Sequence, residues 1–438
     1  MKFLELCNLF EKLESTSKRL DKSSYLLDFI SKNSENGPLV FDLISGKYQK
    51  EINKKNIGIS VKTIIKSIHF VSNKSEKDIE RKFNQIGDVG KLAVEFIDSN
   101  KQKTLSNSPL SLKNILDTFE SIKKTSGKNS NKIKVERISK LFLQADSNIE
   151  IKFLARMLID DYRIGVSEGV LKEAYVSYVF PKIKGIHLIC NNCKSFNFDR
   201  KKCLFCNVEL NNIDSKKVNN ENLENLLNLR DEFIEVENPR EIYNKFNDVI
   251  ENKFNLLNSF RKIHKQYEED KKSLLDFEIE LFNPIKSMLG VRAKNIDEAL
   301  DVVGDNLLAD YKYDGLRIQI HSDGNKVKLF SRNLEDITKQ FPEIIEFIIE
   351  NFPDISFVID SECIGYDFEK EKFLPFQLLS RRIMTKEVDT VSHISISVKA
   401  FDLLYLNGKT LIQNNYKSRR DNLEKLFINR ELRQKISN

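Results

Sequence analysis

The chain has no tryptophan, little glycine and proline, and few cysteines. Its 438 residues include 15 Gly, 8 Pro and 6 Cys. So little Gly and Pro excludes a collagen-like or linker-like chain, and a hydrophobic share of 40% excludes a wholly disordered one. Six cysteines are too few for a disulfide scaffold at this length. We therefore expect globular domains, about three at roughly 150 residues each.

Long apolar runs are absent too. No stretch of about 18 apolar residues occurs, so no transmembrane helix is expected. The first residues, MKFLELCNLFEKLE, are interrupted by charges that the hydrophobic region of a signal peptide does not contain. We expect neither secretion nor membrane insertion. The expected location is the cytoplasm, with the nucleoid, or the nucleus if the source is eukaryotic.

Neither sign of charge dominates. Lys and Arg number 71 and Asp and Glu 65, which gives a net charge of +6. This excess is far from that of a histone tail, but it suits a polyanionic partner that meets one face of the protein.

Hydrophobic spacing divides the chain into four parts. Apolar residues recur at helical spacing through 1–185, and 186–210 hold four of the six cysteines. A polar linker and charged helices are predicted for 211–276. In 277–438 apolar residues alternate with polar ones, and Asp323-Gly324 between two alternating runs predicts a β-hairpin. The predicted fold class is therefore multidomain, α followed by α+β with a mixed, mainly antiparallel sheet.

The clustered cysteines form two C-x-x-C pairs, Cys190 with Cys193 and Cys203 with Cys206. Two such pairs supply four thiolates for a tetrahedral structural zinc site. The surrounding residues are polar, which disfavours the alternative of packed or redox-active cysteines. The pattern predicts a zinc-ribbon-like insertion that binds one structural Zn²⁺.

The candidate chemistry centres on Lys312 in the segment 310–317, DYKYDGLR. A lysine at the end of an apolar strand has its pKa lowered by burial and by a neighbouring cation, which leaves part of it neutral and nucleophilic. Gly315 lets the backbone approach a ligand, and Arg317 offers a fork for phosphate or carboxylate. Taken alone, K-x-D-G is a weak signal because chance matches are common.

An ordered set of motifs follows this lysine. These are 331–333 (SRN), 357–362 (FVIDSE) and 399–406 (KAFDLLYL). In the second motif Asp360 and Glu362 are two apart on a predicted strand, so they share a face. The set resembles that of the covalent nucleotidyltransferases, most closely ATP-dependent DNA ligases of the archaeal and eukaryotic replicative type.

The resemblance reaches the helical half of the chain. The segments 87–90 (GDVG), 154–156 (LAR) and 161–166 (DYRIGV) are similar to signatures of that family's DNA-binding domain. The resemblance implies a DNA-binding domain at 1–185 with the zinc insertion at 186–210, completed by 211–276, and an adenylation domain at 277–438. Only about 186–275 has no counterpart.

The resemblance implies an enzyme that seals nicks in duplex DNA. Lys312 would attack the α-phosphorus of ATP and hold AMP as a phosphoramidate. The AMP then passes to the 5′-phosphate of the nick, and the 3′-hydroxyl displaces it. Such phosphoryl transfer depends mostly on positioning and on charge neutralisation by Mg²⁺ and cations. The implied ATP-binding residues are Asp310, Lys312, Arg317, Arg332, Glu362 and Phe401, with Phe401 stacking on adenine, and the implied Mg²⁺ ligands are Glu362 and Asp360.

A basic loop, 123–132 (KKTSGKNSNK), separates two predicted helices. Its amides and ammonium groups suit a phosphate backbone, and a merely solvated loop explains it equally well. Nicked duplex DNA is the expected partner of a monomeric protein. A sliding clamp is a weaker candidate, since no Q-x-x-apolar-x-x-aromatic pattern opens the chain. The predicted DNA contacts are Lys123, Lys124, Gly127, Lys128, Lys132 and Arg163.

The chain departs from the family pattern in two further respects. Asp310 stands where the family usually has Glu, and a shorter side chain is expected to contact adenine less well. After Asp402 we find neither the later motifs nor the OB-fold domain, so a truncated adenylation domain and an impaired or inactive chain are expected. The alternatives are a catalytically inactive nick-binding protein, or an RNA ligase or capping guanylyltransferase, which the helical domain disfavours.

Overall fold

The protein is described by a computed structural model that covers residues 1–46, 59–97, 109–125, 127, 129–198, 200–210, 214–219, 222–304, 308–367, 370–379 and 395–428. The chain forms two compact units. Unit 1 comprises Met1–Glu251 and Ser259–Leu275, and unit 2 comprises Asn252–Asn258 and Asp276–Asn438. Within the described ranges, no helix combines the length and the apolar character needed to cross a bilayer.

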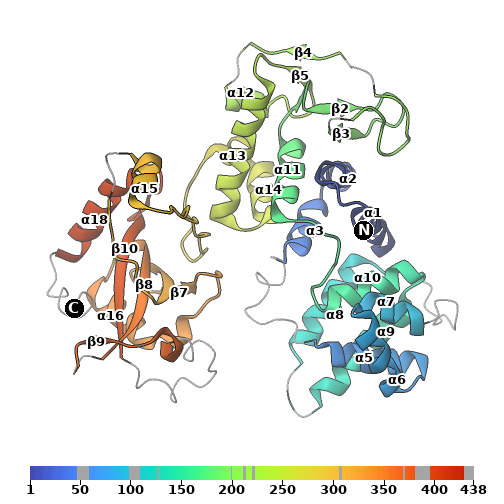
Figure 1. The fold of residues 1–438 in the computed structure, drawn as a ribbon, viewed down its shortest axis with the longest axis horizontal. Coiled ribbons are helices and arrows are strands. Elements are labelled where there is room, and N and C mark those ends of the chain that lie inside the picture. Colours follow the sequence, from blue (N-terminus) through green and yellow to red (C-terminus); the bar gives the residue numbers. More distant parts are fainter. Residues whose placement is uncertain are drawn as a thin grey trace. The chain divides into compact units, whose positions relative to one another are not determined.

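Unit 1 is mainly helical (Figure 1). Apolar residues three or four apart share a helix face and are buried together, as Phe3, Leu6, Phe10 and Leu13 of the first helix are. The helices are α1 (Phe3–Glu14), α2 (Arg19–Lys32), α3 (Gly37–Ile44), α5 (Val61–Ser72), α6 (Glu76–Ile86), α7 (Val89–Phe96), α8 (Leu112–Lys123), α9 (Ser130–Gln144), α10 (Asn148–Leu158), α11 (Glu168–Val179), α12 (Leu223–Leu227), α13 (Pro239–Leu257), α14 (Phe260–Glu269) and the 3-10 turn η1 (Lys271–Leu275).

Short strands interrupt this helical unit. β1 (Lys182–Ile183), β5 (Phe233–Glu235) and β4 (Lys216–Lys217) form a parallel sheet in that order, and β2 (His187–Ile189) pairs antiparallel with β3 (Phe196–Phe198). The expectation of helices alone through 1–185 is wrong at β1, and that of a linker with helices at 211–276 is wrong at β4 and β5, whereas β2 and β3 lie in the expected zinc-ribbon-like insertion. Runs of two or three residues are too short to show a period of two in the sequence.

Unit 2 is built on an antiparallel sheet of strand order β11-β10-β8-β6-β7, with β9 paired to β8. The predicted hairpin is confirmed: the two strands on either side of Asp323-Gly324 pair antiparallel. The elements are α15 (Ile296–Val303), β6 (Leu316–Asp323), β7 (Val327–Ser331), η2 (Thr338–Gln340), α16 (Pro342–Asn351), β8 (Ser356–Asp367), β9 (Lys372–Phe373), β10 (Ile396–Leu406), β11 (Lys409–Thr410) and α18 (Tyr416–Ile428).

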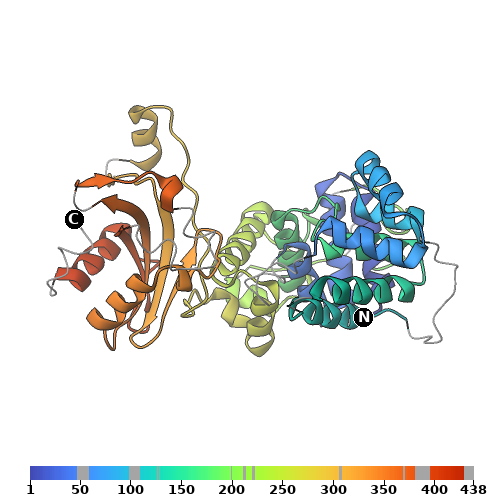
Figure 2. The same ribbon diagram turned by 90° about the horizontal axis from the view of Figure 1, so that it is seen from below.

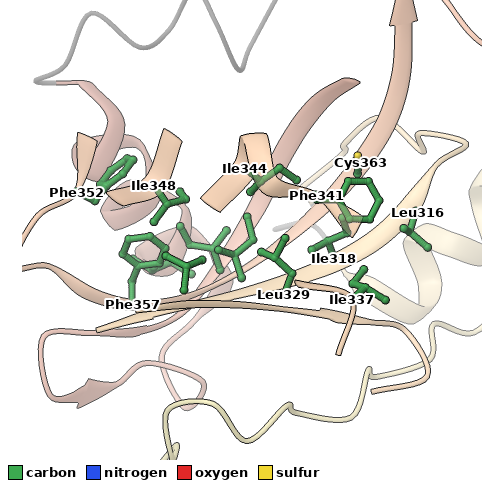
Figure 3. Packing of buried hydrophobic residues seen from close by; sticks show 14 of the residues in the cluster. Leu316, Ile318, Leu329, Ile337, Phe341, Ile344, Ile348, Phe352, Phe357 and Cys363 are labelled. Carbon is green, nitrogen blue, oxygen red and sulfur yellow. The ribbon is translucent and has the colours of Figure 1, made fainter. Parts of the chain in front are cut away.

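One face of this sheet carries the hydrophobic core of unit 2. Side chains of β6, β7, β8 and β10 pack there with α16 and α18, and Figure 3 shows part of the cluster at close range. Figure 2 shows both helices, orange and red, on the same side of the bent sheet. Side chains alternate along a strand, so the residues between the core positions lie on the opposite, polar face.

Candidate active site

Glu362 is the centre of the polar face. On β8 it pairs in register with Arg317 of β6 on one side and with Lys399 of β10 on the other. Burial raises the pKa of Glu362, while a hydrogen bond from the Gly315 N–H and the charges of Lys312, Arg317 and Arg332 act in the opposite direction. The structure therefore brings the predicted nucleophile, two predicted phosphate-binding cations and the predicted acid into one electrostatic site.

Lys312 itself is exposed, and the segment 310–315 precedes β6 rather than ending a strand. The expected burial of the nucleophile is therefore wrong, because strand pairing begins only at Leu316. Gly315 also has a role that the sequence did not indicate. A side chain on Gly315 would collide with the carbonyl oxygen of Cys363, so the glycine allows close contact with β8.

Arg317 and Asp360 form an ion pair on the polar face. Arg317 also donates to Ser287 Oγ at 2.5 Å, and Gln319 Nε2 donates to the second oxygen of Asp360 at 3.0 Å. The Asp360 side chain is only 8% exposed, and burial raises its pKa while Arg317 opposes the shift. Both oxygens of Asp360 already accept hydrogen bonds, and its predicted Mg²⁺ role stays a prediction. Asp360 orients Arg317.

The remaining predicted nucleotide-binding residues lie in the same unit, two of them in contact with α18. Phe401 is half-buried at a bulge of β10, and its carbonyl accepts a hydrogen bond from Tyr416 Oη at 2.9 Å. The Asp310 carboxylate lies 3.7 Å from the guanidinium of Arg420 on α18. Arg332 follows β7 and is exposed.

In unit 1, a buried arginine joins two of the quoted signature segments. The Arg156 side chain is 1% exposed and bonds Asp88 at 2.6 and 3.2 Å and Glu14 at 3.0 and 3.1 Å. Arg163, predicted to contact DNA, donates to the Gly87 carbonyl at 2.6 Å and to Asp161 at 2.8 Å. Its side chain remains 43% exposed, so it retains surface for a ligand.

The basic loop follows α8. Lys124, Gly127 and Lys132 are exposed, and Gly127 has a φ of +99°, a conformation that suits glycine. Lys123 is half-buried, and burial lowers its pKa. Lys128, the other predicted contact in this loop, lies outside the described residues.

The four clustered cysteines come together. Their sulfur atoms all lie within 4.8 Å of one another. Zn–S bonds of about 2.3 Å in a tetrahedron require S···S separations of about 3.8 Å, which this spacing approximates. The Phe205 N–H donates to the sulfur of Cys203 at 3.4 Å. Hydrogen bonds from Val208 and Asn192 lower the pKa of Cys206, while burial and the neighbouring Cys206 and Cys193 sulfurs raise the pKa of Cys190. Donors aimed at sulfur stabilise thiolates, the form that binds metal.

This cysteine module packs on helix α2. Ser195 Oγ donates to Asp28 at 3.0 Å, and Arg200 pairs with Asp21 at 3.1 Å. The rings of Tyr25 and Phe205 meet edge to face with centroids 5.5 Å apart. The module is therefore attached along one side of α2.

Comparison with known proteins agrees with this layout. The family model described as DNA ligase N terminus matches residues 2–176, and the one described as ATP dependent DNA ligase domain matches 287–438. The chain belongs to the ATP-dependent DNA ligase family. The DNA ligase of Nanoarchaeum equitans is 28% identical over 98% of this chain and 65% of its own length, and that of Methanocaldococcus jannaschii is 30% identical over 97% and 64%.

Coverage of these ligases is partial. The chain spans 62–65% of the length of the curated relatives that head the comparison. A solved mycobacterial DNA ligase D complexed with ATP and MES is 29% identical over 27% of this chain and 35% of that one, with a TM-score of 0.23. Relatives named DNA ligase lend no support to the inactive nick-binding alternative, and the N-terminal ligase match lends none to the RNA ligase or capping-enzyme alternative.

Several residues that hold the predicted site residues in the two units were not predicted from the sequence. Ser287 and Gln319 fix Arg317 and Asp360, and Lys22 bonds the carbonyls of the DYRIGV segment. The ion pairs of Arg156 could have been predicted, because an arginine in an apolar helix must find an acidic partner. Lys22 offered no such signal, since it lies in a mixed polar stretch.

Proposed function

We propose that this chain is a DNA ligase that uses ATP to seal nicks in duplex DNA through lysyl-AMP and 5′-adenylated DNA. The convergence of Lys312, Arg317 and Arg332 on Glu362 supports it most strongly. These are the groups that a nucleotidyl transfer requires: one amine nucleophile, fixed cations for phosphate oxygens and one acid.

In the first step, Nζ of Lys312 forms a P–N bond to the α-phosphorus of ATP. The bond from that phosphorus to the pyrophosphate oxygen breaks, and the exposed lysine gives its proton to solvent. In the second step an oxygen of the DNA 5′-phosphate bonds to the α-phosphorus, the P–N bond breaks and the lysine takes up a proton from solvent. In the third the 3′-hydroxyl oxygen bonds to the DNA 5′-phosphorus, its proton passes to solvent and AMP leaves. Each step is an in-line displacement in which fixed cations stabilise charge on the phosphate oxygens.

The roles of the side chains follow from their contacts. Arg317 is oriented by Asp360 and Ser287, so its remaining N–H groups meet the nucleotide at a fixed angle. Arg332 is exposed and adaptable. Glu362 is half-buried and suits Mg²⁺, whose charge neutralises the phosphates. Phe401 offers a ring face to adenine.

Unit 1 is proposed to hold the duplex. Arg163 and the exposed residues of the basic loop would contact phosphates, so affinity should fall with salt at a log–log slope of about −0.9 per phosphate neutralised. The four cysteines are proposed to bind one structural Zn²⁺. A DNA substrate places the protein with the nucleoid or, in a eukaryote, in the nucleus.

Transfer of radiolabelled AMP from ATP to the 438-residue protein tests the proposal. Because the sequence predicts an impaired chain, the wild type is the reference: we expect its acid-labile label to be weak, absent in Lys312→Ala, and at the wild-type level in Lys339→Ala, which removes an exposed lysine of the same unit. Sealing of a singly nicked duplex is then measured with the same proteins. Label that persists in Lys312→Ala would refute the assignment of the nucleophile.

A further inference from the structure

The turn between α10 and α11 has an unusual backbone. The φ angles of Asp160, Arg163 and Gly165 are +58°, +55° and +58°, in the left-handed region. For residues with a side chain this conformation costs of order 1 kcal/mol each, so other contacts must hold the turn.

Two buried cations, Lys22 and Arg156, hold the turn by hydrogen bonds to its carbonyl groups. Nζ of Lys22 donates to the carbonyls of Ile164 at 2.6 Å and Gly165 at 2.7 Å, and Arg156 donates to that of Tyr162 at 3.3 Å. Lys22 is 6% exposed although it carries an amine, and burial lowers its pKa. Burial of an amine costs free energy unless the amine is hydrogen-bonded, and here the carbonyls of Ile164 and Gly165 accept its hydrogen bonds.

The N–H groups of the same turn lie free. Those of Asp160 and Asp161 bond the end of α10. From residue 162 to residue 167, no backbone N–H donates to any group within the described part of the chain. The side chains of Tyr162 and Ile164 are buried, whereas Arg163, Gly165 and Ser167 are exposed. Three carbonyls of the turn are bonded by Lys22 and Arg156, while its N–H groups have no acceptor among the described residues; a run of such free N–H groups is what binds anions.

We propose that Lys22 is a positioning residue for DNA binding: it fixes the turn 162–167 so that the backbone N–H groups and Arg163 contact backbone phosphates. This rests on the proposed function and names the ligand of this surface. The acids nearest to Arg163 are Asp161 and Asp88, at 2.8 and 3.8 Å from its guanidinium, so the exposed 43% of the Arg163 side chain and the backbone N–H groups are left for the phosphate.

The helix that carries Lys22 is fixed on its other side by the cysteine module. Phe198 N–H donates to Ser24 Oγ at 3.3 Å, and the ion pair of Asp21 with Arg200 lies one residue before Lys22. The position of the amine is thus set by contacts on both sides of the helix. The module therefore supports the turn through α2.

The test compares Lys22→Met with Lys18→Met, an exposed lysine just before α2, in the 438-residue protein. Anisotropy of a dye-labelled nicked duplex at several salt concentrations gives the affinity and its salt slope. We expect Lys22→Met to lose about tenfold in affinity and to flatten the salt slope by about one phosphate. Lys18→Met should match the wild type. If Lys22 had no role in the turn, the losses of binding free energy in Lys22→Met and Arg163→Met would add in the double variant. Because Lys22 positions Arg163, we expect the double variant to lose less than the sum of the two single losses.

A second variant guards against misfolding of the first. Gly165→Ala strains a positive φ and places its Cβ 2.7 Å from Lys22 Nζ, so it should also weaken DNA binding. Wild-type affinity in both variants, each folded by circular dichroism, would overturn the inference. If the wild type itself binds no nicked duplex, the proposed function fails instead, and AMP transfer by unit 2 reports on that separately.

Discussion

The two units place their cations in opposite ways. In unit 1, Arg156 and Lys22 are buried, and their hydrogen bonds go to carboxylates and backbone carbonyls. In unit 2, Lys312 and Arg332 are exposed, and their charges lower the pKa of Glu362. The difference teaches that one site uses cations to fix a surface, while the other keeps them free to reach a substrate.

Arg317 stands between these two cases. It is 17% exposed and paired with a buried acid, yet it belongs to the chemical site. Its fixed geometry suits a group that must hold a phosphate without reacting. The contrast between fixed and free cations gives four predictions, ordered by the size of the expected effect.

The largest effect is expected from breaking the buried cation of unit 1. Arg156→Met leaves Asp88 buried without its partner, so we expect a loss of about 3–5 kcal/mol in the free energy of unfolding, measured by urea denaturation. Arg81→Met removes an exposed cation paired with Asp78 and should cost less than about 0.5 kcal/mol. Similar losses in the two variants would contradict the contrast between buried and exposed cations.

The cysteine module should give the next largest effect. Changing Cys190 and Cys206 to Ser should remove one zinc per chain in elemental analysis and lower stability by about 3 kcal/mol, because structural zinc contributes folding free energy. The control is Cys363→Ala, which changes a cysteine of unit 2 outside the cluster. This variant should still contain one zinc per chain. A metal-free wild type would exclude the zinc assignment.

Removing the charge of Glu362 tests the free cations of unit 2. Glu362→Gln should slow AMP transfer by about 100-fold, since it removes a charge that the reacting groups require. Stability should change little, because a half-buried carboxylate with a raised pKa gains from neutralisation. Glu335→Gln, exposed on the same unit, serves as the control. Equal rates of AMP transfer in Glu362→Gln and Glu335→Gln would show that Glu362 is not part of the site.

The smallest effect is a pH dependence of unit 1. Burial alone raises the pKa of Glu14 and Asp88, but the bonds from Arg156 outweigh it and both pKa values lie below their usual range. The unfolded chain then binds more protons between the folded and unfolded values. Stability should therefore fall as pH drops below about 5, by at most about 1.4 kcal/mol per pH unit for each proton. Arg156→Met should show a weaker dependence in the same urea titration.

Local patterns predicted much of this architecture. The β6–β7 hairpin followed from Asp323-Gly324 between alternating runs, and the cysteine cluster followed from its spacing. Contacts across the chain were not predictable in this way. Lys22 lies 142 residues before Ile164 in the sequence, and no periodicity links the two.

The burial of individual side chains was also not predictable from the sequence. The alternation of β8 correctly placed Asp360 and Glu362 on one face, but it could not show that Arg317 and Gln319 enclose the first and leave the second accessible. Lys312 was expected to be buried because a strand was assumed to reach it. The pairing that begins at Leu316 leaves the lysine in solvent.

Mapping the site of adenylation tests the central claim most directly. After incubation with ATP and Mg²⁺, the protein is digested at neutral pH, where a phosphoramidate survives, and the peptides are analysed by mass spectrometry. The account predicts AMP on the single peptide that contains Lys312, and its loss on addition of nicked DNA. AMP on another lysine, or on none while nicks are sealed, would contradict it.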